Sequence, residues 1–377
     1  MSLSVAAQFV PVEIIAREAD RVDRESRFPH ESIEAMRAAG LLGAAVPARF
    51  GGADASAREL SNVIRQAGGA CTSTGMVYGM HVIATKTIAA GAGEGGELAN
   101  ALFAIAEGRH LTTLAFSERG TRSHFWAQVS RAERVVDGVR FDADKSWVTA
   151  ARVAETYVCA VGAPDADDSK VTELYLVDRT APGVEPLAAF DGLGACGNGS
   201  SPVRMRGVEV GDDRRLGEPA SGFGLMMTAT LPWFVLCCAS CCVGLSEQAV
   251  RIAADHLGSS RLEHLDDRLS DLAVNRARLG EAEIRLAQAR ALLERVADQL
   301  DAGAPDQVDL LALKAAAAEA SIAITDELMR ACGGAAYSRH LPLERLFRDA
   351  RAAAVMAPTT EVLRDLLGRT RVGMPLF

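Results

Sequence analysis

The sequence predicts an α+β protein with three regions in the order helical, β, helical. Residues 1–110 carry apolar side chains at helical spacing, and residues 111–220 hold short runs of β-branched or alternating residues between Gly, Asp and Pro. Residues 221–377 contain three long periodic stretches with short connections, which favour an antiparallel four-helix bundle. We therefore expect an N-terminal helical domain, a middle β-domain and a C-terminal bundle with these boundaries.

The first region is expected to consist of short helices joined by tight turns. Pro29 marks a helix start, whereas Gly40, Pro47 and the Gly51–Gly52 pair mark helix ends. Proline lacks the amide hydrogen that a helix interior needs, and glycine readily adopts positive φ.

The elements of the other two regions follow from the period of their apolar residues. Strands are expected at 128–136, 157–161, 174–177 and 203–210. Helices are expected at 231–257, 266–300 and 308–332. Gly303 and Pro305 form the short connection between the last two helices.

Composition and charge exclude several classes of protein. Hydrophobic residues make up 49% and charged residues 24%, as in ordinary globular proteins. A net charge of −9 disfavours a nucleic-acid partner, which would require a basic face. Apolar runs such as 236–245 are about half as long as a membrane span, and residues 1–17 do not resemble a secretory leader. We expect a cytoplasmic protein with reduced cysteines and no membrane partner.

Two motif-like patterns have ordinary interpretations. Gly192, Gly194 and Gly197 have the G-x-G-x-x-G spacing of dinucleotide folds, but residues 198–210 after them have the pattern of a strand, so a glycine-rich turn between strands is favoured. Cys237, Cys238, Cys241 and Cys242 lie within an apolar helical stretch. Side chains at these helical positions fan around the axis and cannot converge on one zinc ion, so core packing is favoured over a cofactor pocket, redox or metal role.

The seven histidines are scattered and show no metal-ligand spacing, so no metal site is predicted.

Two segments require a more specific explanation. Residues 111–124, LTTLAFSERGTRSH, run from a strand-like pattern into a turn rich in hydroxyl groups and backbone amides, which suits an anionic or heteroaromatic ligand as well as an ordinary β-turn. Lys145-Ser-Trp147-Val-Thr149 would place an indole and a hydroxyl on one face of a strand. That arrangement suits a planar cofactor.

Four separated motifs together resemble the acyl-CoA dehydrogenase family over nearly the whole chain. They are the helical segment from Pro29-His-Glu31 to Phe50-Gly51-Gly52, the run Ala115 to Ser123, the run Lys145 to Thr149, and Cys332-Gly333-Gly334 followed by Leu343 to Ala350. The resemblance implies FAD as the cofactor and an oxidoreductase activity.

The resemblance also assigns residues to the flavin end of FAD. It implies that Ser117 binds the flavin pyrimidine edge and that Ser123 lies near the phosphates of the cofactor or substrate. Trp147 would pack over the isoalloxazine ring, Thr149 would lie beside N5, and Thr359 would also contact the cofactor.

Other residues are implied at the adenosine end. Arg330, where the family usually has Gln, would lie beside the ADP part and could pair with the pyrophosphate, next to Gly333 and Gly334. Relatives reach a neighbouring subunit's FAD with Arg-x-x-Phe-Gly, of which this chain keeps Arg261 but not Phe-Gly. A homodimer or homotetramer is expected, because apolar bundle faces of this length normally have a partner.

The catalytic residue stays open. Relatives remove the α-proton of an acyl thioester with a Glu in a Tyr-Glu-Gly-Thr segment, where this chain has Ala357. A minority of relatives use a Glu on the first long bundle helix, where this chain has Phe234. Glu361 is the nearest carboxylate in sequence, one helical turn beyond Ala357, but a solvated or cofactor-proximal helix position is the favoured explanation for it.

These observations favour an FAD-dependent oxidoreductase acting on an acyl thioester, carried on CoA or on an acyl carrier protein, with an altered base. The electron acceptor would be an electron-transfer flavoprotein or oxygen. The alternatives are a flavin monooxygenase on the same fold, which needs no α-base, and a non-catalytic flavin- or acyl-binding homologue.

Overall fold

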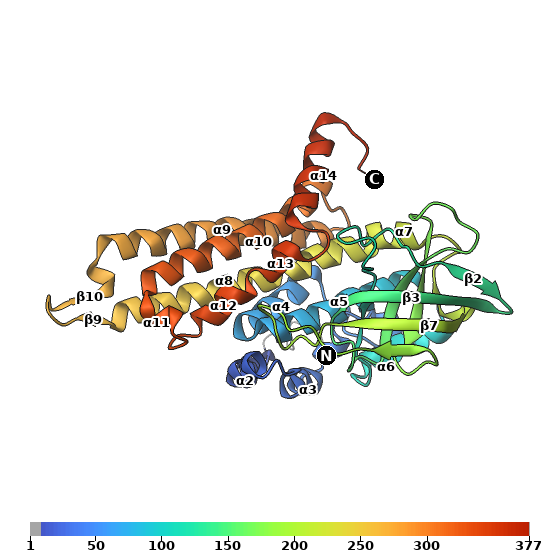
Figure 1. Cartoon of the computed structure of the whole chain (residues 1–377), viewed down its shortest axis with the longest axis horizontal. Coiled ribbons are helices and arrows are strands. Elements are labelled where there is room, and N and C mark those ends of the chain that lie inside the picture. Colours follow the sequence, from blue (N-terminus) through green and yellow to red (C-terminus); the bar gives the residue numbers. More distant parts are fainter. Residues whose placement is uncertain (1–8, 377) are drawn as a thin grey trace.

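The computed structural model describes residues 9–376. Residues 1–8, part of the segment 1–17 that was compared with a secretory leader, lie outside the described residues. Helices come first, two sheets follow, and long helices come last. Figure 1 shows the long helices running along the molecule, with the sheets at one end. The predicted α+β class and this order of regions are confirmed.

The first region is helical, as its Pro and Gly residues predict, but its helices are not all short, because one of them spans 20 residues. They are α2 (Val12–Arg24), α3 (His30–Ala38), α4 (Ala57–Ala70), α5 (Thr72–Gly91) and α6 (Glu97–Ala106). Pro29 directly precedes α3, and Gly40 with φ of +74° turns the chain after it. Ser56 caps α4 by accepting a hydrogen bond from the Glu59 amide at 3.1 Å, which satisfies one free amide of the first turn.

The middle region forms two four-stranded sheets. Their orders are β1-β4-β5-β8 and β2-β3-β7-β6. The strands are β1 (Thr112–Ala115), β2 (Ala132–Val135), β3 (Gly138–Val148), β4 (Thr156–Gly162), β5 (Thr172–Asp178), β6 (Val184–Pro186), β7 (Ser201–Gly211) and β8 (Arg215–Leu216). Residues 192–197 precede β7 rather than a helix, as predicted.

One predicted strand, 128–136, is shorter in the structure and spans only β2. The backbone amides of Val129 and Ser130 donate to the Glu118 carboxylate at 2.6 and 3.1 Å instead of to a neighbouring strand. A side chain from another segment therefore replaces the sheet hydrogen bonds at this position.

The last region is built on three long helices: α8 (Leu231–Ser259), α9 (Ala273–Asp301) and α10 (Gln307–Cys332). Before α8, the chain passes through α7 (Gly222–Leu225) and a π-helical turn at Met226–Thr230. The three long helices pack against one another, and α14 (Thr360–Val372) packs against α10. Between α10 and α14 lie α11 (Gly334–Tyr337), α12 (Leu343–Asp349) and α13 (Ala352–Val355).

The predicted start of the second long helix, at residue 266, is wrong. The residues before α9 form a small hairpin of β9 (Arg261–Leu262) and β10 (Asp267–Arg268), then a 3₁₀ turn at Leu269–Asp271. Asp266 has φ of +54°, which suits a turn and not a helix. Within this turn the Asp271 carboxylate accepts a hydrogen bond from the Arg268 amide at 2.7 Å, and helix α9 begins two residues later.

Helix α8 is the central core helix and carries the cysteine cluster. Residues 222–259 are long and apolar enough to cross a membrane, but 78% of their most apolar window is buried inside the protein. Cys237, Cys238 and Cys241 face the core shared with α4 and α5, whereas Cys242 faces the core of the bundle. All four are buried, which confirms the core-packing interpretation.

Candidate active site

A buried ion pair fixes the loop that follows β1. Lys145 on β3 donates from Nζ to the Glu118 carboxylate at 2.7 Å, to Gln128 Oε1 at 2.9 Å and to the Ala160 carbonyl. Burial alone would raise the pKa of Glu118, but the Lys145 charge and the hydrogen bonds outweigh it and hold this pKa below its usual value. Because Glu118 also accepts the two amides beyond the turn, the loop from residue 116 to 130 is held at both ends.

Trp147 is turned out of the sheet by an irregularity in β3. Its φ is +56°, and the pairing with β7 shifts register between Lys145 and Val148. Regular alternation would put Trp147 on the buried face with Lys145, yet the indole is 62% exposed. A large apolar ring is thereby presented to whatever binds above the strand.

Trp147 and Thr149 do not share a regular strand face, so that expectation is wrong. The strand ends at Val148, and Thr149 is only 6% exposed, with Oγ1 3.2 Å from Ser200 Oγ. Ser117 lies beside them, because its carbonyl accepts the Ser146 amide at 2.9 Å. Ser117, Trp147 and Thr149 therefore gather at the end of β3.

The segment that holds Ala357 is fixed from α10 by a residue that sequence reasoning missed. Lys314 is buried and donates from Nζ to the carbonyls of Ala353, Met356 and Pro358 at 2.8, 3.0 and 2.8 Å. Burial lowers the pKa of Lys314. The available signal was a lysine inside the apolar run of a core helix, where charge is rarely tolerated unless it is paired.

Thr359 follows this segment as the N-cap of α14. Its side chain accepts a hydrogen bond from the Val362 amide at 3.5 Å, so the hydroxyl lies at the positive end of the helix dipole. A helix start of this kind favours negative charge.

Phe234, at which the resemblance implies the alternative base position, is part of an aromatic cluster. Phe234 on α8 stacks with Phe125 at 6.5 Å between ring centroids, and Phe125 stacks with Phe116 at 6.2 Å. Trp126 meets Phe125 edge to face at 5.3 Å. These rings join the loop after β1 to α8 and give this part of the site an apolar surface.

Glu361 lines a hollow of about 410 Å³ between α14 and the same loop. His124 and Trp126 line it from the loop, Lys170 from the β-domain, and Leu376 from the chain beyond α14. Glu361 is exposed there and therefore lies at a concave surface beside the loop after β1.

Ser123 lies on the loop after β1, whereas the residues predicted for the adenosine end lie at the opposite end of the long helices (Figure 1). Arg261 on β9 pairs with Asp266, and Arg330 near the end of α10 pairs with Asp326 at 2.9 Å. Gly333 has φ of +59°, and no atom stands within 4 Å of the Cβ positions of Gly333 and Gly334. Figure 1 places β9 and α11 far from the sheets, so one chain does not bring these residues to Trp147.

Comparison with known proteins decides the family. Residues 1–95 match the acyl-CoA dehydrogenase N-terminal domain, and residues 220–371 match the acyl-CoA dehydrogenase C-terminal domain. The chain belongs to the acyl-CoA dehydrogenase family. It is 27% identical to the human mitochondrial short-chain specific acyl-CoA dehydrogenase over 364 residues, covering 97% of this chain and 87% of the relative.

Other members of the family show similar resemblance. A 3-sulfinopropanoyl-CoA desulfinase of Paraburkholderia xenovorans is 24% identical, with 99% of this chain and 96% of the relative covered. The structure of butyryl-CoA dehydrogenase from Megasphaera elsdenii superposes with a TM-score of 0.91 at 19% identity, covering 98% of this chain and 97% of that one. This second likeness shows the shared fold.

This acyl-CoA dehydrogenase family member is a flavoenzyme whose cofactor is FAD. Its residues fit that group. Trp147 offers an exposed apolar ring, Thr359 stands at a helix start, and the open backbone at Gly333 and Gly334 leaves space for close approach of a ligand. When bound, FAD supplies a hydride acceptor for the oxidation.

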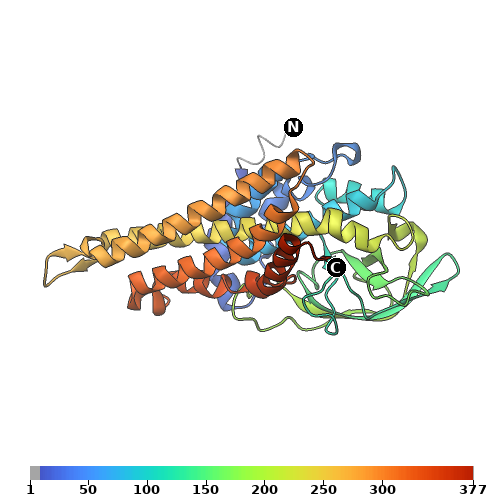
Figure 2. The same ribbon diagram turned by 90° about the horizontal axis from the view of Figure 1, so that it is seen from above.

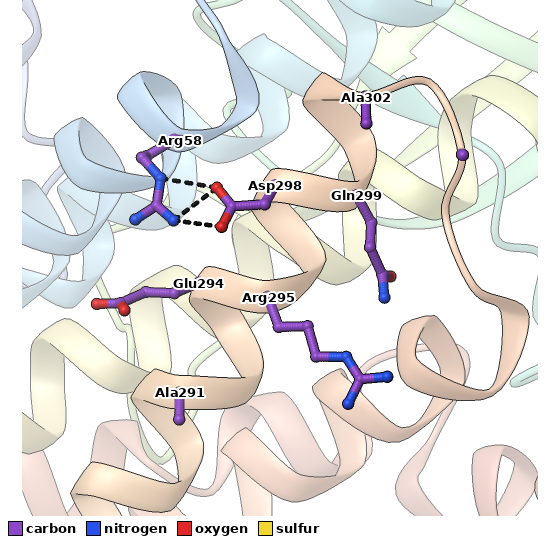
Figure 3. Close-up of a pocket in the computed structure, with 8 residues that line it drawn as sticks. Arg58, Ala291, Glu294, Arg295, Asp298, Gln299 and Ala302 are labelled. Carbon is purple, nitrogen blue, oxygen red and sulfur yellow. Dashed lines mark hydrogen bonds and ion pairs between the residues drawn. The ribbon is translucent and has the colours of Figure 1, made fainter.

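A larger hollow of about 540 Å³ lies elsewhere in this acyl-CoA dehydrogenase family member, between the start of α4 and the end of α9. Figure 3 shows Arg58 of α4 pairing with Asp298 of α9, with Nε–Oδ1 at 2.8 Å. Glu294 and Arg295 stand beside them. The hollow holds none of the predicted cofactor residues, and we assign it to helix packing. Among residues 9–376, no group of three His, Cys, Asp or Glu side chains could hold a metal ion.

Proposed function

We propose that the protein is an FAD-dependent oxidoreductase of an acyl thioester that lacks the carboxylate base of its relatives. One observation supports the proposal: the segment in which the resemblance places the base carries Ala357, and Lys314 holds this segment through three carbonyl groups. In the family, a carboxylate removes the α-proton while the β-hydrogen leaves as hydride to FAD. Lys314 holds this segment in place, but the side chain at residue 357 is a methyl group.

FAD would be held by residues from two chains. Ser117, Trp147, Thr149 and Thr359 would hold the flavin end, with Trp147 against the ring, and Ser123 would lie near the phosphates of the cofactor or substrate. Arg261, Arg330, Gly333 and Gly334 would hold the adenosine end of the FAD of a second copy. The support is that the two groups of residues lie far apart within one chain, since β9 and α11 stand at the opposite end from the sheets (Figures 1 and 2). A homodimer or homotetramer would then be required for a complete cofactor site.

Glu361 is the substitute base in this proposal. It lines the hollow beside the loop after β1 together with His124. The cluster around Phe234 and Phe125 offers no comparable proton acceptor, because its phenyl rings and the Trp126 indole carry no basic group. Positioned general-base help is typically worth about 10²- to 10⁴-fold in rate. Glu361→Gln should therefore slow proton removal while leaving the fold intact, because the side chain is exposed.

The acyl carrier is CoA or an acyl carrier protein. Relatives of similar identity are named for CoA thioesters, including the desulfinase of Paraburkholderia xenovorans. A structure of the prolyl acyl carrier protein oxidase AnaB superposes with a TM-score of 0.85. The acceptor of the electrons would be an electron-transfer flavoprotein or oxygen.

The test follows flavin bleaching when acyl-CoAs or acyl carrier proteins are added without oxygen. A simple saturated acyl-CoA should reduce the flavin slowly. Ala357→Glu combined with Pro358→Gly should speed bleaching by about 10²-fold or more, because it restores a carboxylate and the glycine that relatives have beside it. The single change Pro358→Gly is the matched control and should leave the slow rate unaltered.

Rapid bleaching by the unaltered protein would show that a group other than residue 357 removes the α-proton efficiently. The variant Glu361→Gln then tests whether the Glu361 carboxylate is that base. If that variant bleaches as fast as the unaltered protein, Glu361 is not the base.

The aromatic cluster favours a flavin monooxygenase as the second candidate. Phe234 and Phe125 make the second base position apolar, and oxygen transfer requires no α-proton removal. The measurement is oxygen uptake after photoreduced enzyme is mixed with oxygen and a thioester. Product bearing one oxygen atom from O₂ would support this function, whereas an unsaturated thioester would exclude it.

A further inference from the structure

Trp147 is not isolated on the surface, because Phe190 stacks on it. The ring centroids lie 3.9 Å apart, with an angle of 24° between the ring planes. Phe190 belongs to the connection between β6 and β7, far from β3 in sequence. The sequence motif around Trp147 gives no indication of this partner.

Phe190 is held in place by Ser200, the residue directly before β7. Its backbone amide donates to the Ser200 carbonyl at 2.9 Å, and Ser200 Oγ lies 3.2 Å from Thr149 Oγ1. Ser200 is itself fixed by the Asn198 side chain, which accepts its amide at 2.8 Å. One residue therefore ties the phenyl ring to the hydroxyl that is expected beside the flavin.

The stack leaves one face of the indole free. With one face of Trp147 against Phe190, its 62% exposure must come from the other face and the edges. We propose that Phe190 is a positioning residue for FAD, which backs the indole so that its free face receives the isoalloxazine ring. This inference rests on the proposed role of Trp147 in binding the flavin.

The physical reason is preorganisation. A side chain that is held by a neighbour before the ligand arrives loses less conformational freedom on binding. Offset stacking of aromatic rings also adds a directional attraction to their burial. Removing the phenyl ring should therefore weaken FAD binding without removing any group that contacts FAD.

The experiment compares Phe190→Ala, Phe190→Leu and Phe190→Tyr as purified holoenzymes. Release of FAD on dilution, followed by flavin fluorescence, gives the dissociation constant. Phe190→Ala should weaken FAD binding roughly three- to tenfold. Phe190→Tyr should restore binding to within about twofold, because its ring stacks equally well. Phe190→Leu keeps bulk without a ring and should bind FAD less tightly than Phe190→Tyr.

Phe103→Ala is the matched control for general loss of stability. Phe103 on α6 is also a partly exposed phenylalanine in an aromatic pair, with Phe50 at 5.8 Å, and it lies outside the site. Its removal should lower the melting temperature and leave the affinity for FAD unchanged. The proposal would be overturned if Phe190→Ala bound FAD as tightly as the unaltered protein or more tightly. It would also be overturned if Phe190→Leu and Phe190→Tyr had equal affinity for FAD, and this second comparison remains decisive if Phe190→Ala proves unstable.

Trp147→Ala separates this inference from the assignment on which it rests. If Trp147→Ala weakens FAD binding but the Phe190 variants do not, only the role of Phe190 fails. If Trp147→Ala also binds FAD normally, the indole is not the flavin platform.

Discussion

The ammonium group of Lys145 lies 2.7 Å from the carboxylate of Glu118, and the two side chains are 0% and 5% exposed. This pair joins β3 to the loop after β1, which carries Ser117 and Ser123. A buried ion pair gives weak support to stability by itself, but losing one partner leaves an uncompensated charge. The pair therefore makes the shape of the loop depend on both residues.

Lys145→Met should destabilise the protein by about 3–5 kcal/mol and weaken FAD binding, because the Glu118 carboxylate loses its counter-charge in the interior. Urea unfolding and FAD release measure the two effects. Asp144→Asn is the control on the same strand; Asp144 pairs with Arg206 at 2.8 Å on the surface, and its loss should cost less than about 1 kcal/mol. Equal unfolding midpoints for the two variants would argue against this role of Lys145.

Gly244→Ala should destabilise the contact between α8 and α4 by about 3 kcal/mol, because a Cβ at residue 244 would stand 1.9 Å from the Arg65 carbonyl oxygen. Gly258 lies on the same helix with nothing within 4 Å of its Cβ position. Gly258→Ala should therefore be neutral or stabilising by up to about 1 kcal/mol. Thermal or urea unfolding checks the contrast, and a tolerated Gly244→Ala would show that the helices can separate at little cost.

His81 should make stability depend on pH. The ring is fully buried between the Leu42 carbonyl at 2.9 Å and the Thr112 amide at 3.2 Å, and burial lowers its pKa to about 4. The unfolded chain binds this proton near pH 6.5, so stability falls as pH drops from 6.5 toward 4. The loss from His81 between pH 7 and pH 5 should be about 2 kcal/mol.

Urea unfolding of the unaltered protein and of His81→Gln at pH 7 and pH 5 measures the contribution of His81 to the loss of stability. Burial raises the pKa of Asp349 to about 6, so Asp349 favours the folded state as pH falls, opposite to His81. The unaltered protein and His81→Gln both retain Asp349, so its effect cancels in the comparison. His340→Gln, at an exposed histidine, is the control for loss of a ring. If His81→Gln keeps the full pH dependence, His81 is not its source.

The thiols should react as a buried set. Seven of the eight cysteines are buried, and Cys196 is half-buried. Burial raises the pKa values of Cys237 and Cys241 well above the usual one, which suppresses the reactive thiolate. Titration of native protein with a thiol reagent should show at most one fast group, absent in Cys196→Ser, and all eight groups in urea. Fast reaction of several thiols would mean that α8 is accessible.

Arg330→Ala should weaken FAD binding by about tenfold or more if the guanidinium pairs with the pyrophosphate. Arg330 is paired with Asp326 in the single chain, so Asp326→Asn keeps the cation and should bind FAD at least as well as the unaltered protein. Dilution of the holoenzyme gives both constants. An unaltered affinity in Arg330→Ala would remove this residue from the site.

The sequence by itself determined the order of regions and the family. Helix α10 was predicted to within one residue, because its apolar period is long and Gly333 interrupts it. The start of α9 was misplaced by seven residues, since the turn at Asp266 depends on φ and on hydrogen bonds that a period cannot reveal. Local patterns predict local structure where no distant side chain competes with them.

The site was decided by contacts between segments far apart in sequence. The motif around Trp147 suggested a flat surface for a cofactor, but only the bulge in β3 exposes the indole, and only the fold brings Phe190 onto it. In the sequence, Lys314 is one lysine within a helical pattern. Only the fold brings the three carbonyl groups of the segment before α14 to its ammonium group. Which residues lie near the flavin stays a prediction from the sequence. Which side chains hold them is a property of long-range packing, because a buried charge or ring takes its partners from whatever the fold places beside it.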